Sequence, residues 1–183
     1  AESNTVYNNG YIGIGIQGDN DVSSDAKLNI VRYNNVYNSE RGIFLDEYAS
    51  SNLIVHNFVS NNAIGGIAIN TSNVLFNTIA SNFISNNFNG VYAQFGEYNS
   101  ILSDQIYANT NGIVLVNIAN IIVERNIIQD STENGIMVTN AGEVYINYNN
   151  IISNYNGMYL VGGGSVDIAE NNLYDNANTS AYV

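Results

Sequence analysis

The sequence repeats itself with a period of about 23 residues from near residue 4 almost to its end, and this regularity limits the fold more than any other feature. One marker of the repeat is a glycine followed by an apolar residue, any residue and a second apolar residue. The other marker is an asparagine, or once an aspartate, followed two residues later by an aliphatic residue. The glycines are Gly13, Gly42, Gly66, Gly90, Gly112, Gly135 and Gly157, and the polar series is Asn4, Asn34, Asn57, Asn82, Asp104, Asn126, Asn149 and Asn171. Such a period predicts stacked units in which each residue lies next to its counterpart one repeat away.

Within each repeat, apolar residues alternate with polar ones over short stretches, which predicts about three short strands and no helix. Two arrangements of these strands are possible. The dipeptide Asn-Gly, at 9–10, 89–90, 111–112, 134–135 and 156–157, is typical of antiparallel hairpins and would give a meander or a barrel. The same residue type at the same offset in every repeat favours a parallel solenoid instead, because aligned asparagine side chains can hydrogen-bond along the stack.

The pattern Asn-x-[Ile/Val]-x-x-Asn followed by Asn-Gly-[Ile/Val]-x-[Leu/Ile] covers residues 4–176, and one copy reads NNIISNYNGMYL at 149–160. It resembles the right-handed parallel β-helix repeat of pectate-lyase-like polysaccharide lyases, mannuronan epimerases, carbohydrate-binding and sugar-hydrolase domains, and phage tailspikes. The resemblance implies an all-β solenoid of about 7–8 coils, with about 22–24 residues per coil. We expect a single domain, residues 1–183, ending in a short tail outside the repeat at 177–183. The repeat is specific for a fold and not for an activity.

The charge balance narrows the range of partners. The chain has 16 acidic and 4 basic residues, and its net charge of -12 opposes binding to nucleic acids and to anionic membranes. No apolar run approaches the ~20 residues that cross a bilayer, and the start Ala-Glu-Ser is typical of a terminus left by signal cleavage. We therefore expect a secreted, extracellular or cell-surface protein with no nucleic-acid partner and no membrane span.

The ends of the repeat array bear on assembly. No atypical capping repeat is evident, since Asn4 comes almost at once and only residues 177–183 follow Asn176. A solenoid without caps exposes unpaired strand edges. Two interpretations stay open: the chain is a piece of a longer solenoid, or copies of it associate end to end, which builds a filament when the stack does not close.

The resembled enzymes combine aspartates with a basic residue or a tyrosine, and their epimerases carry Asp-Pro-His-Asp, whereas this chain has no proline and a single histidine. His56 and Arg125 share a column three coils apart, about 14 Å. Arg32 can approach His56 across one coil, but no carboxylate joins them.

Asp130 and Asp175 lie two coils apart, about 10 Å, in a column that elsewhere holds asparagine. The sequence thus predicts no catalytic residues; if the protein is an enzyme, we expect a polysaccharide lyase or a glycoside hydrolase.

The longest insertion, residues 18–25, carries oxygen ligands at alternate positions, as the opening of a calcium loop does. A plain acidic loop is the alternative, because a helical calcium hand would need Gly and Glu where the chain has Ser24 and Ile30. The candidate ligands are Asp19, Asp21, Ser23 and Asp25, and no cofactor other than this Ca²⁺ is expected. Sequons that begin at Asn70 and Asn178 are candidate glycosylation sites.

Two columns that we expect to face outward are rich in aromatic residues. One contains Phe44, Tyr92 and Tyr159, and the other contains Tyr7, Tyr37, Tyr107 and Tyr174. Exposed flat rings suit the faces of sugars or a packed neighbour, and simple stacking between parallel strands is the alternative. We interpret these seven residues as a contact or carbohydrate surface, through which identical rods can also pack laterally.

Three functions therefore stay open, and nothing specific in the sequence supports the third, a periplasmic accessory protein. The first is an extracellular structural or adhesive β-solenoid, a subunit of a surface assembly or filament. The second is a carbohydrate-active module that binds or cleaves a polysaccharide. Convergence of a carboxylate with a basic or tyrosine side chain in one groove would favour an enzyme.

Overall fold

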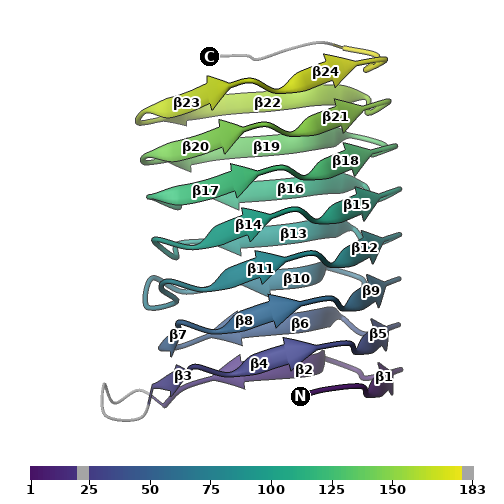
Figure 1. Ribbon diagram of the computed structural model, residues 1–183, viewed down its shortest axis with the longest axis vertical. Coiled ribbons are helices and arrows are strands. Elements are labelled where there is room, and N and C mark those ends of the chain that lie inside the picture. The colour runs from purple at the N-terminus through teal and green to yellow at the C-terminus, as the bar shows by residue number, and fades with distance from the viewer. Residues whose placement is uncertain (20–24, 179–183) are drawn as a thin grey trace.

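The computed structural model describes residues 1–19 and 25–178, which form a rod of stacked coils (Figure 1). Each coil adds one strand to each of three sheets, and the strand pairs within these sheets are parallel. The predicted all-β, right-handed parallel β-helix is confirmed, and the hairpin arrangement is wrong. Over the described residues, no helix is long and apolar enough to cross a membrane.

Sheet I is made of three-residue strands. It contains β1 (Thr5–Tyr7), β5 (Asn35–Tyr37), β9 (Phe58–Ser60), β12 (Phe83–Ser85), β15 (Gln105–Tyr107), β18 (Ile127–Gln129), β21 (Asn150–Ile152) and β24 (Asn172–Tyr174).

Sheet II has the longest strands. It contains β2 (Ile12–Gln17), β6 (Arg41–Asp46), β10 (Gly65–Ile69), β13 (Asn89–Gln94), β16 (Asn111–Val116), β19 (Asn134–Ala141) and β22 (Asn156–Gly163).

Sheet III closes the coil. It contains β4 (Ile30–Arg32), β8 (Leu53–Val55), β11 (Thr78–Ala80), β14 (Ser100–Leu102), β17 (Ile121–Glu124), β20 (Val144–Asn147) and β23 (Val166–Ala169). A small additional pair joins β3 (Ala26–Lys27) to β7 (Ala49–Ser50).

Aliphatic side chains fill the interior of the rod. In sheet I the middle residue of each strand points inward, and Val59, Ile84 and Ile106 are fully buried. These residues lie in register, since Ile84 pairs with Val59 on one side and with Ile106 on the other. Each fully buried side chain of this kind stabilises the fold by about 1.5–3 kcal/mol, so the stacked aliphatic columns are the main source of stability.

The marker glycines occupy positions where a side chain has no room. A Cβ atom on Gly42 would lie 2.5 Å from the carbonyl oxygen of Gly66, and one on Gly112 would lie 2.5 Å from that of Gly135. Such a contact is far inside van der Waals distance, so the backbone would have to move. The glycine column therefore reports close packing of successive coils.

The corners on either side of sheet I are single residues in the left-handed region. Asn8, Asn38, Asn61 and Asn86 have φ of 55°, and Asp130 and Asp175, with φ of 57° and 55°, continue this column. Asparagine and aspartate are the non-glycine residues that adopt this conformation most readily. The conformation of the corner thus accounts for the two aspartates without any catalytic role.

The predicted asparagine ladder is confirmed. Asn34 donates from Nδ2 to Oδ1 of Asn57, and Asn57 donates to Oδ1 of Asn82, at 2.9 and 3.0 Å. The series runs on to Asn171, and the described strands extend beyond it to Tyr174. Residue 178, which we assigned to a tail outside the repeat, still forms a bridge with Asn156.

Sequence reasoning missed further ladders at other corners of the coil. The largest sets are Asn29, Asn52, Asn77 and Asn99, then Asn62, Asn87 and Asn109, and finally Asn89, Asn111, Asn134 and Asn156. Their signal was present as asparagine recurring at the same spacing. These amides pair buried polar groups that would otherwise destabilise the rod.

Candidate functional site

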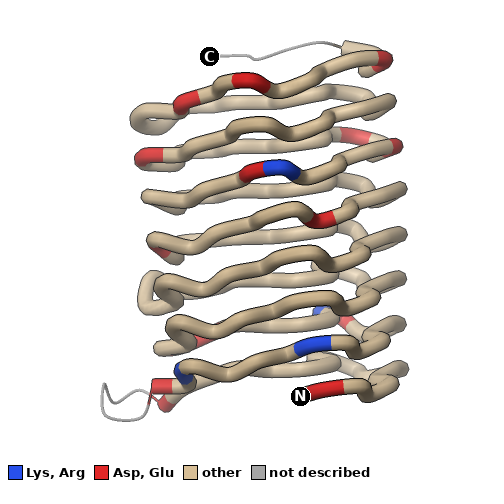
Figure 2. The backbone as a smooth tube through the Cα atoms, in the orientation of Figure 1, with Lys and Arg blue, Asp and Glu red and all other residues tan. Residues whose placement is uncertain are grey.

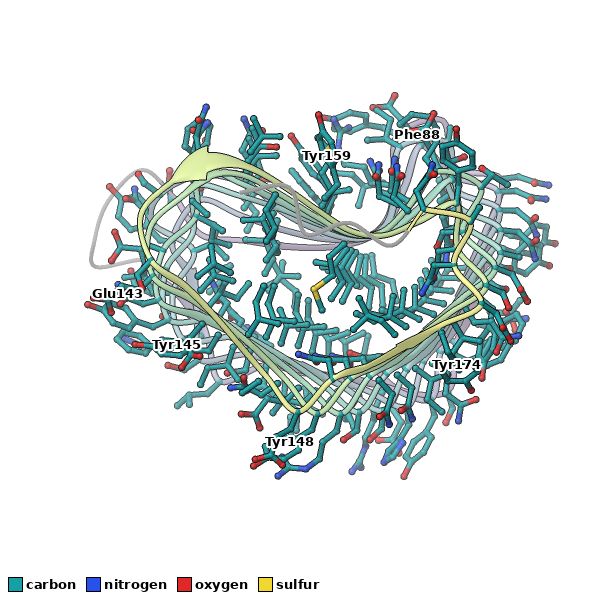
Figure 3. All side chains as sticks on the ribbon, turned by 90° about the horizontal axis from the view of Figure 1, so that it is seen from above. Phe88, Glu143, Tyr145, Tyr148, Tyr159 and Tyr174 are labelled. Atoms are coloured by element: carbon teal, nitrogen blue, oxygen red, sulfur yellow. The ribbon has the colours of Figure 1, made fainter. Side chains whose placement is uncertain are left out.

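The candidate site is a hollow in the outer face of sheet II, which combines aromatic, amide and charged side chains. Seen along the rod, this face curves inward, and Phe88 and Tyr159 project outward from the same side of the cross-section (Figure 3). The hollow has a volume of about 470 Å³, which falls within the usual range for small-ligand pockets. It is lined by Arg41, Phe44, Ala63, Ile64, Ala68, Asn70, Phe88, Asn89, Tyr92 and Gln94.

The hollow exists because β10 carries small residues where its neighbours carry large ones. Gly65 pairs with Arg41 on one side and Asn89 on the other, and Ala68 pairs with Phe44 and Tyr92. A Cβ atom on Gly65 would lie 3.6 Å from the Ala68 Cβ and 3.7 Å from the Tyr92 Cβ, which is ordinary contact. Unlike the marker glycines, Gly65 is therefore not required by backbone packing, and its effect is to deepen the hollow.

Arg41 lies at the end of the hollow nearer the N-terminus. Its guanidinium carbon is 4.9 Å from the centre of the Tyr11 ring and 5.2 Å from that of Phe44. The guanidinium also forms an ion pair with Glu40, the preceding residue. The cation–π contacts and the ion pair together hold this long side chain in one place. Arg41 is the one charged residue among those that line the hollow.

Tyr92 lies at the opposite end, two coils further along. Its hydroxyl donates to Oε1 of Gln94 at 2.8 Å. Burial raises the pKa of this phenol above its ordinary value, and the nearby Arg41 opposes part of the rise. Tyr92 consequently keeps its proton at neutral pH and presents a ring and a hydrogen-bonding hydroxyl to the hollow.

Amide groups form the polar rim. On one side, Asn89 accepts from Asn111 at 3.2 Å, and its own Nδ2 donates to the Ile64 carbonyl at 3.1 Å. On the other side, Asn70 donates to Oδ1 of Asp46 at 3.5 Å. Amides and hydroxyls around apolar rings can bind a ligand with many hydroxyl groups, since such ligands need both donors and acceptors.

The predicted aromatic surface is divided between two faces. Phe44, Tyr92 and Tyr159 lie on sheet II. Phe44 is only 4% exposed, and the Arg41 guanidinium lies over its ring, so the expectation of an open stripe is wrong there. Tyr7, Tyr37, Tyr107 and Tyr174 lie on sheet I. Tyr7 stacks on Tyr37 with ring centres 5.2 Å apart, and Tyr174 is exposed.

The residues considered for catalysis do not come together. His56 stacks on Tyr33, at 5.4 Å between ring centres, and the register pairs Arg32 with Val55. The expected approach of Arg32 to His56 is thus wrong, because the neighbour in the same corner column is Tyr33. Arg32 instead forms an ion pair with Glu2 at 2.9 Å.

The predicted calcium loop is only partly within the described residues, since Asp21 and Ser23 lie outside them. Asp25 lies 3.7 Å from the Lys27 amine. Within residues 1–19 and 25–178, no group of three or more His, Cys, Asp or Glu side chains could hold a metal ion. The calcium loop and the glycosylation of Asn70 and Asn178 stay predictions, although Asn70 lines the hollow.

Arg41 and Tyr92 lie at opposite ends of the hollow, two coils apart. Glu40, the carboxylate paired with Arg41, lies outside the lining, so among the described residues no carboxylate converges with a basic or tyrosine side chain in the hollow. The carboxylate of Glu40 is held by Arg41, and Tyr92 keeps its proton. Such an arrangement offers donors, acceptors and ring faces to a ligand. Sequence reasoning missed Arg41, Glu40 and Phe88, because no repeat marker includes them.

Residues 75–177 match the family described as right handed beta helix region. This chain belongs to that family. No curated protein matches the sequence.

Three solved β-helices illustrate the relationship. The periplasmic alginate epimerase AlgG has a TM-score of 0.76 and 19% identity over 94% of this chain and 43% of that chain. Tailspike protein 2 of the Escherichia coli O157:H7 bacteriophage CAB120 has a TM-score of 0.71 and 15% identity over 88% and 27%. The A-module of the Azotobacter vinelandii mannuronan C-5 epimerase AlgE4 has a TM-score of 0.70 and 14% identity over 92% and 53%. At these identities the likeness shows the fold alone, and this β-helix spans less than half the length of AlgG.

Proposed function

We propose that this β-helix binds carbohydrate, and that the hollow on sheet II is its binding site. The observation that carries the proposal is the hollow itself, in which ring faces and amide groups converge. Sugars present apolar ring faces bordered by hydroxyl groups, and aromatic rings with nearby amides complement both features. Two structural neighbours, an alginate epimerase and a mannuronan epimerase, act on polysaccharides, which adds support.

A secreted or cell-surface location is part of the same proposal. It is supported by two of the structural neighbours, since one is a periplasmic epimerase and the other is a phage tailspike protein. Polysaccharides are abundant in such compartments, and a β-helix that binds them there serves as an adhesive or recognition module.

Glycan-array screening followed by calorimetry tests the proposal with two matched variants. Phe88 and Phe76 are 53% and 56% exposed, and only Phe88 lines the hollow. We expect Phe88→Ala to weaken glycan binding about tenfold, as loss of one ring contact of about 1–1.5 kcal/mol does. Phe76→Ala, which removes a similar ring elsewhere, should leave binding unchanged. Equal affinities of the two variants, or no glycan bound by the wild type, would contradict the assignment.

Self-association is a second candidate function, supported by the outer face of sheet I. None of its eight strands contains Asp, Glu, Lys or Arg, although the chain carries a net charge of -12. Phe58 stacks on Phe83 at 4.9 Å, and Phe83 stacks on Tyr107 at 5.5 Å. An uncharged aromatic face is where two such anionic rods can meet with the least repulsion.

Sedimentation velocity of the wild type and of Phe58→Lys would test this second candidate. We expect the wild type to form dimers or larger species that the added charge removes, and a wild type that stays monomeric would refute lateral association. End-to-end stacking stays a separate prediction, for which electron microscopy should reveal fibres.

A further inference from the structure

The positive charge of Arg41 at the hollow is neutralised by an ion pair with Glu40. We propose that the site therefore selects uncharged glycans over acidic ones, an inference that rests on the carbohydrate-binding function proposed above. Arg41 supplies the single positive charge in the lining. Its ion pair with Glu40 returns the local charge to zero before any ligand arrives. An acidic sugar that bound Arg41 would have to compete with Glu40 for the same guanidinium.

The geometry makes this competition unfavourable. The side chains of Arg41 and Glu40 are 21% and 34% exposed, so water screens their attraction less than it screens an open surface pair. The rings of Tyr11 and Phe44 hold the guanidinium from its faces. Because the side chain is held by three partners, it is not free to turn toward an incoming carboxylate.

The surroundings oppose anions further. Asp46 borders the hollow through its hydrogen bond with Asn70, and it adds a negative charge there. The few Lys and Arg residues of the rod are scattered among more numerous acidic ones (Figure 2). A polyanionic chain would meet repulsion from the rod as a whole, whereas an uncharged chain would meet none.

The remaining polar groups of the lining suit hydroxyl groups. Asn70, Asn89 and Gln94 are uncharged amides, and Tyr92 is a neutral phenol at neutral pH. Hydroxyls both donate and accept, and amides offer both kinds of partner, while a carboxylate only accepts. The lining thus complements hexoses better than uronates.

A matched pair of probes tests the selectivity directly. The β-1,4-linked mannose hexasaccharide and the corresponding mannuronate hexasaccharide share one backbone and differ in the carboxylate at C6. Calorimetry on the wild type should give tighter binding of the neutral probe, with an affinity independent of salt. Tighter binding of the mannuronate probe, weakened by salt, would overturn the inference and leave the proposed function intact. No binding of either probe, together with a negative array screen, would overturn the proposed function itself.

Two variants separate the local ion pair from the overall charge. Glu40→Gln frees Arg41, and we expect the affinity for the mannuronate probe to rise about threefold while that for the neutral probe stays constant. Glu133→Gln is the control: Glu133 directly precedes β19 as Glu40 directly precedes β6, and the two positions are four coils, or about 19 Å, apart. The control variant should leave both affinities unchanged. An equal rise in the two variants would trace the effect to net charge and refute a role for the Glu40–Arg41 pair.

Discussion

Asp104 replaces asparagine in the buried ladder, and this exchange predicts an unusual dependence of stability on pH. The side chain is fully buried, and burial raises the pKa of its carboxyl group from 3.8 to about 7. Hydrogen bonds from the backbone N and Nδ2 of Asn82 to Oδ1, at 2.7 and 2.9 Å, oppose part of that rise. Among the described residues, Oδ2 has no hydrogen-bond partner.

The chemistry of the ladder explains why the protonated form is preferred. In the neighbouring coil, Nδ2 of Asn82 donates to the carbonyls of Ile54 and Ala80. In Asp104, Oδ2 takes the place of this amide nitrogen, and a carboxylate oxygen can only accept. A proton on Oδ2 restores one donor at that position, whereas an ionised carboxylate would be buried beside acceptors.

The sign and magnitude follow from proton linkage. Between pH 3.8 and about 7 the unfolded chain has lost this proton and the folded chain keeps it, so stability falls as the pH rises. The fall amounts to about 4 kcal/mol and is complete above the folded-state pKa. Asp104→Asn removes the effect and supplies the missing donor. We expect the variant to be about 4 kcal/mol more stable than the wild type at pH 8, and to differ by about 1 kcal/mol or less at pH 4.

Urea unfolding of both proteins at the two pH values measures this difference. Asp130→Asn is the matched control, because it makes the same substitution at an exposed corner where other coils carry asparagine. The control should show the same change of stability with pH as the wild type. If Asp104→Asn and the wild type lose the same free energy of unfolding between pH 4 and pH 8, the carboxyl group is not held protonated in the fold.

Three further predictions concern the packing of the rod, and urea unfolding measures each of them. Gly42→Ala should lower the free energy of unfolding by about 1–3 kcal/mol, because the new Cβ would meet a carbonyl oxygen at 2.5 Å. Gly65→Ala should change it by less than about 0.5 kcal/mol. Equal losses in the two variants would refute the distinction between the two glycines. Asn57→Ala should cost about 2–3 kcal/mol, since it leaves buried ladder groups without partners, and Asn172→Ala, at an exposed position, should cost much less. Phe83→Ala should cost about 1 kcal/mol through the loss of two ring stacks, and an unchanged stability would mean that these stacks contribute nothing.

The repeat made the fold predictable to the level of individual columns. Asn57 and its counterparts lie in register as expected, because a residue in a parallel solenoid hydrogen-bonds to the equivalent residue of the next coil. The expectation failed where one column met another. Arg32 was expected to be able to approach His56 across one coil, but Arg32 forms an ion pair with Glu2, and His56 stacks on Tyr33. Tyr33 and His56 each precede a ladder asparagine, so the repeat aligns them, but it does not say which side chains of neighbouring columns make contact.

The sequence by itself determined the solenoid, its parallel pairing and its asparagine ladder, since each depends on interactions between equivalent residues, and these recur at every coil. Only the tertiary structure decided where differences between the coils form a candidate binding site. The hollow depends on Gly65 and Ala68 lying between larger neighbours, on the inward curve of sheet II, and on Arg41 being held by Glu40 and two rings. These features depend on unlike residues, some within one coil and some in adjacent coils, which a repeat pattern averages away. The fold could therefore be predicted from the sequence, and the site could not.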